Sequence, residues 1–183
     1  MRGLVTPLFI WSLASLPLWL GLCRSRGKTM AWAGAVVAVG GLVLWVATAG
    51  LGYRVTENLS GSLNGHLYVH RAGEVFRKGD LVAFRWKGDR HYPAGTVFIK
   101  RVAGWPGEHV RREGRAFWIG DAYIGLAKPF SKAGVALEPA AEGVIPAGQY
   151  FVATEHADSL DSRYALVGTL PQHVIIGRAH ELF

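Results

Sequence analysis

One lysine of this 183-residue sequence lies where acid–base chemistry is possible. Lys100 belongs to the segment VFIKRVA (97–103), and strand alternation would put it on the same face as Phe98 and Val102. Lysine normally titrates near 10.4, and removal from water favours the neutral amine, which can accept a proton from a serine. Lowering its pKa by about three units destabilises the ammonium by roughly 4 kcal/mol and requires substantial burial. From this segment alone, an ammonium that stays in water above an apolar stem is the simpler interpretation.

Two serines lie in the stretch ENLSGSLNGH (57–66), which comes soon after a long apolar run. Ser60 and Ser62 are flanked by glycines, which let a backbone approach a bound peptide closely. The stretch is either a flexible linker or a loop that presents a hydroxyl to a partner near a membrane. The residues that surround it in the fold must decide between the two.

Two uncharged runs, 4–23 and 30–51, are each about 20 residues long, roughly the length that crosses a ~30 Å hydrocarbon core. We therefore expect two transmembrane helices. Pro7 and Pro17 weaken the prediction for the first run, although membrane helices tolerate proline. A cleaved secretion signal is an alternative there, and a lipoprotein signal would need a small residue before Cys23, where a leucine stands.

Basic residues between the two runs predict the orientation of the chain. Three of them lie in the connection 24–29 and only Arg2 precedes the first run, so the positive-inside rule puts the connection in the cytoplasm. The sequence then divides into a membrane anchor, 1–53, and an external domain, 54–183. In a bacterium this predicts an inner-membrane protein with a periplasmic domain.

The net charge of +7 does not predict a nucleic-acid partner. Residues 1–53 carry four basic and no acidic side chains, and residues 54–183 carry 16 basic and 13 acidic ones, without a recognisable nucleic-acid module. Cys23 is the only cysteine, so neither an internal disulfide nor a thiolate metal site is expected. His66 and His70 would lie about 13 Å apart along a strand, too far to share one metal ion. We expect no metal and no cofactor.

The external domain is predicted to be mostly β, an antiparallel barrel or sandwich. Short apolar runs rich in β-branched and aromatic residues are bounded by Gly, Pro or Asp, and helical periodicity is absent. Gly120 and Asp121 predict a hairpin turn, and the Pro-, Gly- and Ala-rich stretch 126–146 predicts a loop. The predicted strands are 69–70, 81–86, 96–102, 116–119, 123–124, 150–153 and 173–176.

Four short motifs, in this order after an apolar anchor, resemble the boxes of the type I signal peptidase family. The resemblance covers nearly all of 54–183, and VIIGR (174–178) is similar to the family's closing strand. The resemblance implies a signal-peptidase-like fold. Each box alone indicates the family only weakly, and the four in this order indicate it strongly. The boxes are SGSL (60–63), KGDLVAF (78–84), FIKRVAGWPGE (98–108) and DSRY (161–164).

Within that family, the serine region is most similar to the TraF-type conjugative-transfer peptidases, which mature pilin precursors and can close them into rings. Asn64 stands where that pattern has proline and His66 where it has glycine, which leaves the subfamily and the substrate open. The matching positions are Asn58, Ser60, Ser62, Leu67 and Tyr68.

The resemblance implies that Ser62 is the nucleophile and Lys100 the general base of a serine–lysine dyad. The two residues are 38 positions apart, and nothing local in the sequence shows that they meet. By the same analogy, the Ser62 backbone N–H and the Ser60 hydroxyl would stabilise the oxyanion. Ser159 would orient the lysine, and Asp161 and Arg163 would form a supporting ion pair.

The function implied is that of a membrane-bound serine endopeptidase. Its partners would be the lipid bilayer, a membrane-tethered precursor resembling pilin and other components of a secretion or conjugation apparatus. The acyl-enzyme would end in cleavage by water or in cyclisation by the substrate's own amino terminus. A general leader peptidase and a catalytically silent assembly protein of a conjugation apparatus are the alternatives.

Overall fold

The computed structural model describes residues 8–58, 61–89 and 92–182. The chain divides into two compact units, Met1–Thr48 and Ala49–Phe183. The first unit is helical, and the regular structure of the second is mainly β-strand, with irregular segments between the strands.

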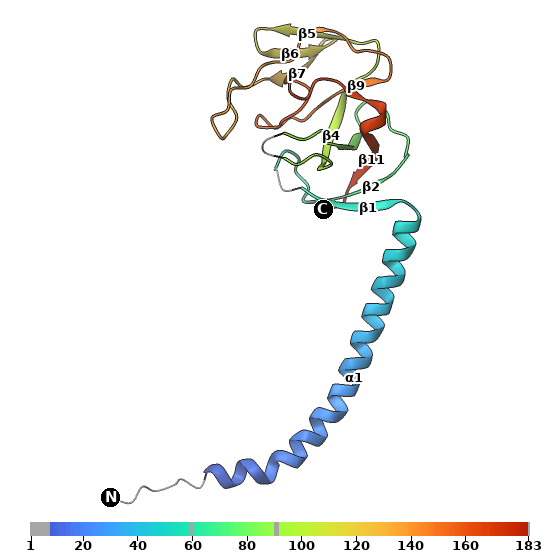
Figure 1. Cartoon of the computed structure of the whole chain (residues 1–183), viewed down its shortest axis with the longest axis vertical. Helices are drawn as coiled ribbons and strands as arrows, with labels where there is room; N and C mark the ends of the chain where they lie inside the picture. The colour runs from blue at the N-terminus through green and yellow to red at the C-terminus, as the bar shows by residue number, and fades with distance from the viewer. Residues whose placement is uncertain (1–7, 59–60, 90–91, 183) are drawn as a thin grey trace, which may run out of the picture. The chain divides into compact units, whose positions relative to one another are not determined.

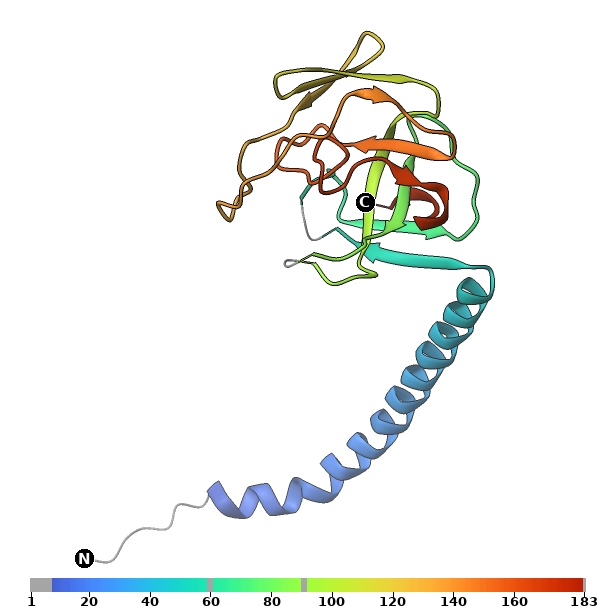
Figure 2. The same cartoon turned by 45° about the horizontal axis from the view of Figure 1, so that its top comes forward.

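The prediction of two transmembrane helices separated by a loop at 24–29 is wrong for this structure, and residues 4–7 of the first predicted helix lie outside the described residues. One continuous helix, α1 (Leu8–Gly50), runs through the connection 24–29, as Figures 1 and 2 show. Arginine and lysine are strong helix formers, and the single glycine of the connection costs only about 1 kcal/mol, so the basic segment does not interrupt the helix. Within the described residues, one stretch, Gly27–Val46, has the length and composition to cross a membrane.

The second unit contains a seven-stranded antiparallel sheet in the order β1-β2-β11-β3-β4-β9-β10. Strands adjacent in this sheet are often distant in the sequence: β11 lies between β2 and β3 and pairs with both. The strands in sheet order are β1 (Tyr53–Glu57), β2 (Leu67–Arg71), β11 (Ile175–Glu181), β3 (Leu81–Arg85), β4 (Val97–Gly104), β9 (Gln149–Ala153) and β10 (Leu170–Pro171).

A second, four-stranded antiparallel sheet has the order β7-β6-β5-β8. Figure 1 shows its longer strands lying together. The hairpin between β6 and β7 turns at Gly120, whose φ of 58° suits glycine, so the predicted turn is confirmed. The strands are β5 (His109–Glu113), β6 (Ala116–Ile119), β7 (Ala122–Leu126) and β8 (Gly143–Val144).

The structure confirms a mostly β, antiparallel domain, and it differs from the sequence prediction at several strands. β1, β5, β8 and β10 were not predicted, and β11 begins after a short 3-10 helix, Gln172–Val174, that occupies part of the predicted strand 173–176. The stretch 126–146 is mainly irregular, as predicted, and contains the bridge between Phe130 and Ala136.

Strand β4 belongs to all three clusters of the apolar core. Phe98 and Val102 pack in the first cluster with Phe84, Trp86 and Val152. On the opposite face of the strand, Ile99 belongs to the third cluster and Ala103 packs against the second. Because both faces of β4 are packed, its side chains are held in place from two sides.

Candidate active site

Lys100 is positioned by the centre of the large sheet. It pairs with Val82 of β3, and its side chain is only 5% exposed. The ammonium therefore does not lie in water, so the simpler interpretation of this lysine is wrong. The pKa of Lys100 is lowered from 10.5 to about 8, mainly because burial disfavours the charge, with Asp161 opposing and Arg163 adding to the shift.

Ser62 lies in the loop that joins β1 to β2, and Asn58 holds this loop closed. The Asn58 backbone N–H donates to the His66 carbonyl at 2.8 Å. Its side-chain amide donates to the carbonyls of Leu63 and Gly65, each at 3.0 Å. These bonds tie the end of β1 to both the middle and the far end of the loop.

Tyr68, the second residue of β2, fixes the same loop from the other side. Its hydroxyl accepts a hydrogen bond from the Gly65 backbone N–H at 3.0 Å, and its side chain is fully buried in the third core cluster. The serine loop is therefore not a free linker, because its backbone is tied at several points to the sheet.

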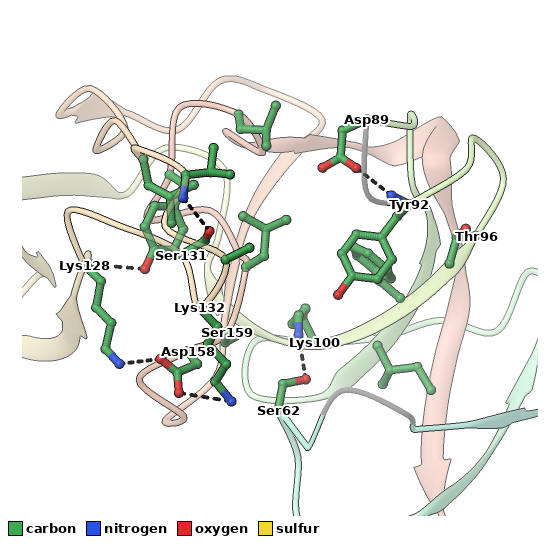
Figure 3. Close-up of a pocket in the computed structure, with 18 of the residues that line it drawn as sticks. Ser62, Asp89, Tyr92, Thr96, Lys100, Lys128, Ser131, Lys132, Asp158 and Ser159 are labelled. Carbon is green, nitrogen blue, oxygen red and sulfur yellow. Dashed lines mark hydrogen bonds and ion pairs between the residues drawn. The ribbon is translucent and has the colours of Figure 1, made fainter.

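The fold brings the two predicted dyad residues together. The Lys100 Nζ and Ser62 Oγ atoms lie 2.7 Å apart, and the serine is 6% exposed (Figure 3). A neutral amine at this distance can take the hydroxyl proton directly. The pair has the geometry that a serine nucleophile and its base require.

Asp161 and Arg163 form a buried ion pair beside the dyad lysine. The Arg163 Nε and Nη2 atoms each donate to a separate Asp161 oxygen at 2.8 Å, and both side chains are almost completely buried. Burial alone would lower the pKa of Arg163, but the hydrogen bonds and charge of Asp161 hold that pKa above its ordinary value. Breaking such a buried pair from one side leaves an uncompensated charge.

Gly125 in β7 makes room for this arginine. A Cβ atom there would lie 2.5 Å from the Arg163 Nη1 atom, and the glycine has a φ of 137°. Arg163 also donates to the backbone carbonyls of Leu126, Thr154 and His156, at 3.3, 3.4 and 3.2 Å. The arginine thus links the small sheet to the segment that follows β9.

The structure places one other predicted support residue beside the dyad without the expected hydrogen bond. Ser159 lines the same cavity as Lys100, but its buried Oγ atom has no partner among the described residues. Ser60, the predicted helper for the oxyanion, lies outside the described residues.

The dyad opens onto a cavity of about 970 Å³. One wall is the first half of β4 with the loop before it, and the facing wall comes from the irregular segment 128–138 and the turn before Asp161 (Figure 3). The lining on both walls is largely apolar, with Val97, Phe98 and Ile99 on one side and Val135 and Leu137 on the other. Its size and apolar character suit an extended peptide segment.

Sequence reasoning missed the residues that build the far wall. Lys128 and Lys132 both contact Asp158, Lys132 at 3.3 Å, and the hydrogen bond from Lys128 is the largest cause of the lowered Asp158 pKa. The Lys128 backbone N–H also donates to the Tyr164 hydroxyl at 3.1 Å. The loop composition of 128–138 carried no signal for these contacts.

Of the two histidines considered for a metal site, His66 ends the serine loop and His70 belongs to β2. His70 is buried, and its Nε2 atom lies 3.1 Å from the Thr56 hydroxyl. Burial and the nearby Arg54 lower its pKa. Among the residues that the structure describes, no group of three His, Cys, Asp or Glu side chains is arranged to hold a metal ion.

A buried serine–lysine pair at the wall of a peptide-sized cavity defines a candidate acyl-transfer hydrolase. Comparison with known proteins supports this class of enzyme, because residues 27–183 match the family model described as "Signal peptidase, peptidase S26". The chain belongs to this family. Signal peptidase I proteins are serine endopeptidases, and the family is membrane-associated.

One curated protein and one solved structure were also found in comparisons with the chain. The chain is 29% identical over 117 residues to signal peptidase I U of Bacillus subtilis, covering 59% of this chain and 58% of that protein. The chain thus spans less than two thirds of the length of this curated relative. A crystal structure of a signal peptidase I from Enterococcus faecalis is similar at 22% identity and a TM-score of 0.38, covering 57% of this chain and 97% of that one.

Proposed function

We propose that this chain is a membrane-bound serine endopeptidase that removes the leader segment of exported precursors through a Ser62 acyl-enzyme. The observation that carries the proposal is the 2.7 Å contact between the Ser62 Oγ and Lys100 Nζ atoms, buried at the wall of the large cavity. Membership of the signal peptidase family supports leader peptides as the substrate class.

In the first half of the reaction, the neutral Lys100 amine takes the Ser62 proton while Oγ attacks the carbonyl that follows a short small-residue motif. The C–N bond then breaks, and the Lys100 ammonium returns the proton to the departing amine. In the second half, the same amine takes a proton from water as the water oxygen attacks the ester carbon. The C–Oγ bond then breaks, the Lys100 ammonium returns the proton to Ser62 Oγ, and the product acid leaves and ionises to a carboxylate. The Ser62 backbone N–H and the Ser60 hydroxyl would stabilise each oxyanion.

Asp161 and Arg163 support the reaction from behind the lysine. Their effects on the pKa of Lys100 are opposite in sign, Asp161 raising it and Arg163 lowering it, and burial is the largest cause of the lowered value of about 8. A base with this pKa is partly neutral near physiological pH and is still basic enough to accept the serine proton. The ion pair also fixes the segment that carries Ser159.

The proposed location is the bacterial inner membrane, with the catalytic domain in the periplasm. The apolar part of α1, Gly27–Val46, and the membrane association of the family support an anchored enzyme. The basic residues that precede this stretch favour a cytoplasmic start by the positive-inside rule. A membrane-tethered precursor and the catalytic domain would then lie on the same side of the membrane.

The proposed substrate is a pilin precursor of a conjugation apparatus. The support is the similarity of the serine region to TraF-type peptidases, at Asn58, Ser62 and Tyr68 among others. If the substrate's own amine replaces water in the second half of the reaction, an amide bond forms and the product is a ring.

A general leader peptidase is the second candidate, favoured by the similarity to signal peptidase I U of Bacillus subtilis. It would process many secreted proteins rather than one pilin. The third hypothesis is a catalytically silent assembly protein. The dyad geometry disfavours it, because a buried lysine lowers the stability of the fold and a silent protein would gain nothing from it.

The test is the intact mass of a pilin precursor co-expressed with the unaltered chain, Ser62→Ala, Lys100→Ala or the control Lys87→Ala, whose lysine is exposed. We expect shortening with the unaltered chain and the control only, and a product lighter by one further water if a ring forms. Processing by both dyad variants would refute the mechanism. An intact precursor in every arm, with other secreted proteins shortened, would favour the general peptidase.

A further inference from the structure

Tyr92 is held in a fixed position at the edge of the dyad cavity by its own loop. This loop joins β3 to β4, and the Asp89 backbone N–H donates to the Tyr92 carbonyl at 2.9 Å. In return, the Tyr92 backbone N–H donates to the Asp89 carboxylate at 2.7 Å. The two bonds join Asp89 to Tyr92 and fix the direction in which the tyrosine side chain leaves the backbone.

An aromatic series links the Tyr92 ring to the core. Its ring packs edge-on against Phe98, with centroids 5.2 Å apart, and Phe98 stacks on Trp86 at 5.3 Å. Trp86 is buried in the first core cluster. A ring fixed in this way loses little conformational entropy when a ligand binds to it, so its contacts contribute to affinity almost in full.

The phenol hydroxyl points into the cavity that Ser62 and Lys100 line (Figure 3). Tyr92 is 41% exposed, and its hydroxyl has no hydrogen-bond partner among the residues that the structure describes. The wall beside it, from Val97 to Ile99, is apolar. A rigid hydroxyl on an otherwise apolar wall is a point at which a ligand can be oriented.

The other hydroxyls of the cavity are already engaged or buried. Thr96 Oγ1 donates to the Pro93 carbonyl at 2.7 Å, and Ser131 Oγ accepts from the Val135 backbone N–H at 3.1 Å. The Tyr164 hydroxyl accepts from a backbone N–H, and Ser159 is fully buried. Of this set, Tyr92 alone presents an accessible hydroxyl without a partner in the described part of the chain.

We propose that Tyr92 is a substrate-binding residue whose hydroxyl hydrogen-bonds a backbone peptide group of the precursor, while its ring covers one side of the bound segment. An extended peptide offers both carbonyl acceptors and N–H donors, and a phenol can satisfy either. This role rests on the proposed function, since it requires a peptide in the cavity beside Ser62.

Binding is measured first, in the absence of turnover. Full-length Ser62→Ala protein in detergent micelles is titrated with a fluorescent peptide that carries an Ala-x-Ala motif, and the titration is repeated after adding Tyr92→Phe, Tyr92→Ala or Tyr53→Phe. Tyr53 lies in β1 and does not line the cavity, so its hydroxyl is the matched control. Tyr92→Phe should raise the Kd about 3- to 10-fold, the effect of one neutral hydrogen bond, and Tyr92→Ala should raise it further.

Cleavage of the same peptide separates this role from the proposed function. With Ser62 present, Tyr92→Phe should lower kcat/KM by the same factor as it weakens binding, and Tyr53→Phe should leave it unchanged. If the unaltered chain cleaves the peptide and Tyr92→Phe equals it in both assays, the role of Tyr92 is wrong and the peptidase stands. If the unaltered chain neither binds nor cleaves the peptide or a pilin precursor, the proposed function fails, and this role fails with it.

Discussion

Replacing Lys100 with methionine should make the folded protein more stable at neutral pH while abolishing cleavage. The pKa of this lysine is about 8 in the folded chain, against an ordinary value of 10.5. Below pH 8 the folded protein must hold a buried ammonium that the unfolded chain keeps in water. The destabilisation is complete below pH 8, decreases between pH 8 and 10.5 and vanishes above, where both states carry the neutral amine.

The two pKa values give the size of the effect. Their difference corresponds to about 3 kcal/mol of destabilisation at pH 7. Methionine has a similar length and carries no charge, but it leaves the Ser62 hydroxyl without its 2.7 Å partner, at a cost of about 1 kcal/mol. The net gain is about 2 kcal/mol at pH 7, or roughly 6 °C in Tm, and it should reverse to a small loss near pH 10.5.

Thermal unfolding in detergent micelles, followed by tryptophan fluorescence, measures the effect, since Trp86 is buried in the folded domain. Tm values of the unaltered chain and of Lys100→Met are compared from pH 7 to 10.5. Lys87→Met is the control, because this lysine is exposed and its replacement should give a difference that does not vary over the range. A Lys100→Met variant that is less stable at pH 7, or a difference independent of pH, would refute the burial argument.

Further predictions concern the same site. The kcat of the unaltered chain should rise with pH through about 8, reaching roughly a tenth of its maximum at pH 7, because the base Lys100 must be neutral; a profile flat from pH 6 to 9 would contradict this. Asp161→Asn should lower the free energy of unfolding by about 3–5 kcal/mol in chemical denaturation, since Arg163 would remain buried without a counter-charge. Asn58→Ala should lower kcat about 10-fold or more with KM nearly unchanged, because the two hydrogen bonds that position the Ser62 loop are lost. Steady-state kinetics measure both constants, and a change in KM alone would instead assign Asn58 to substrate binding.

The sequence predicted the strand that carries Lys100, because its alternation is a local property. It could not show that Ser62 lies beside it. The serine loop ends at β2 and the lysine belongs to β4, and these strands are connected in the sheet only through β11 and β3. The similarity to a family supplied that pairing, and the catalytic roles of both residues remain predictions.

The strands that the sequence analysis missed do not alternate regularly between buried and exposed residues. β1 buries none of its residues fully, and β5 buries only Val110, so neither has a clear alternation of apolar and polar residues. The cavity wall at 128–138 is fixed by distant partners, including Tyr164 and Asp158, rather than by its own pattern. The continuous α1 was missed because hydropathy separates apolar runs and gives no information on whether a helix continues between them.

The position of β11 in the large sheet has a consequence for the order of folding. During synthesis, β2, β3 and β4 are complete long before β11 is made, yet β2 and β3 have β11 between them and do not pair with each other. The contact between Ser62 and Lys100 therefore depends on a strand of high sequence separation, a type of pairing that forms late and slowly. A nascent chain would carry both Ser62 and Lys100 without an assembled active site. Proteolytic activity would arise only when β11 pairs between β2 and β3.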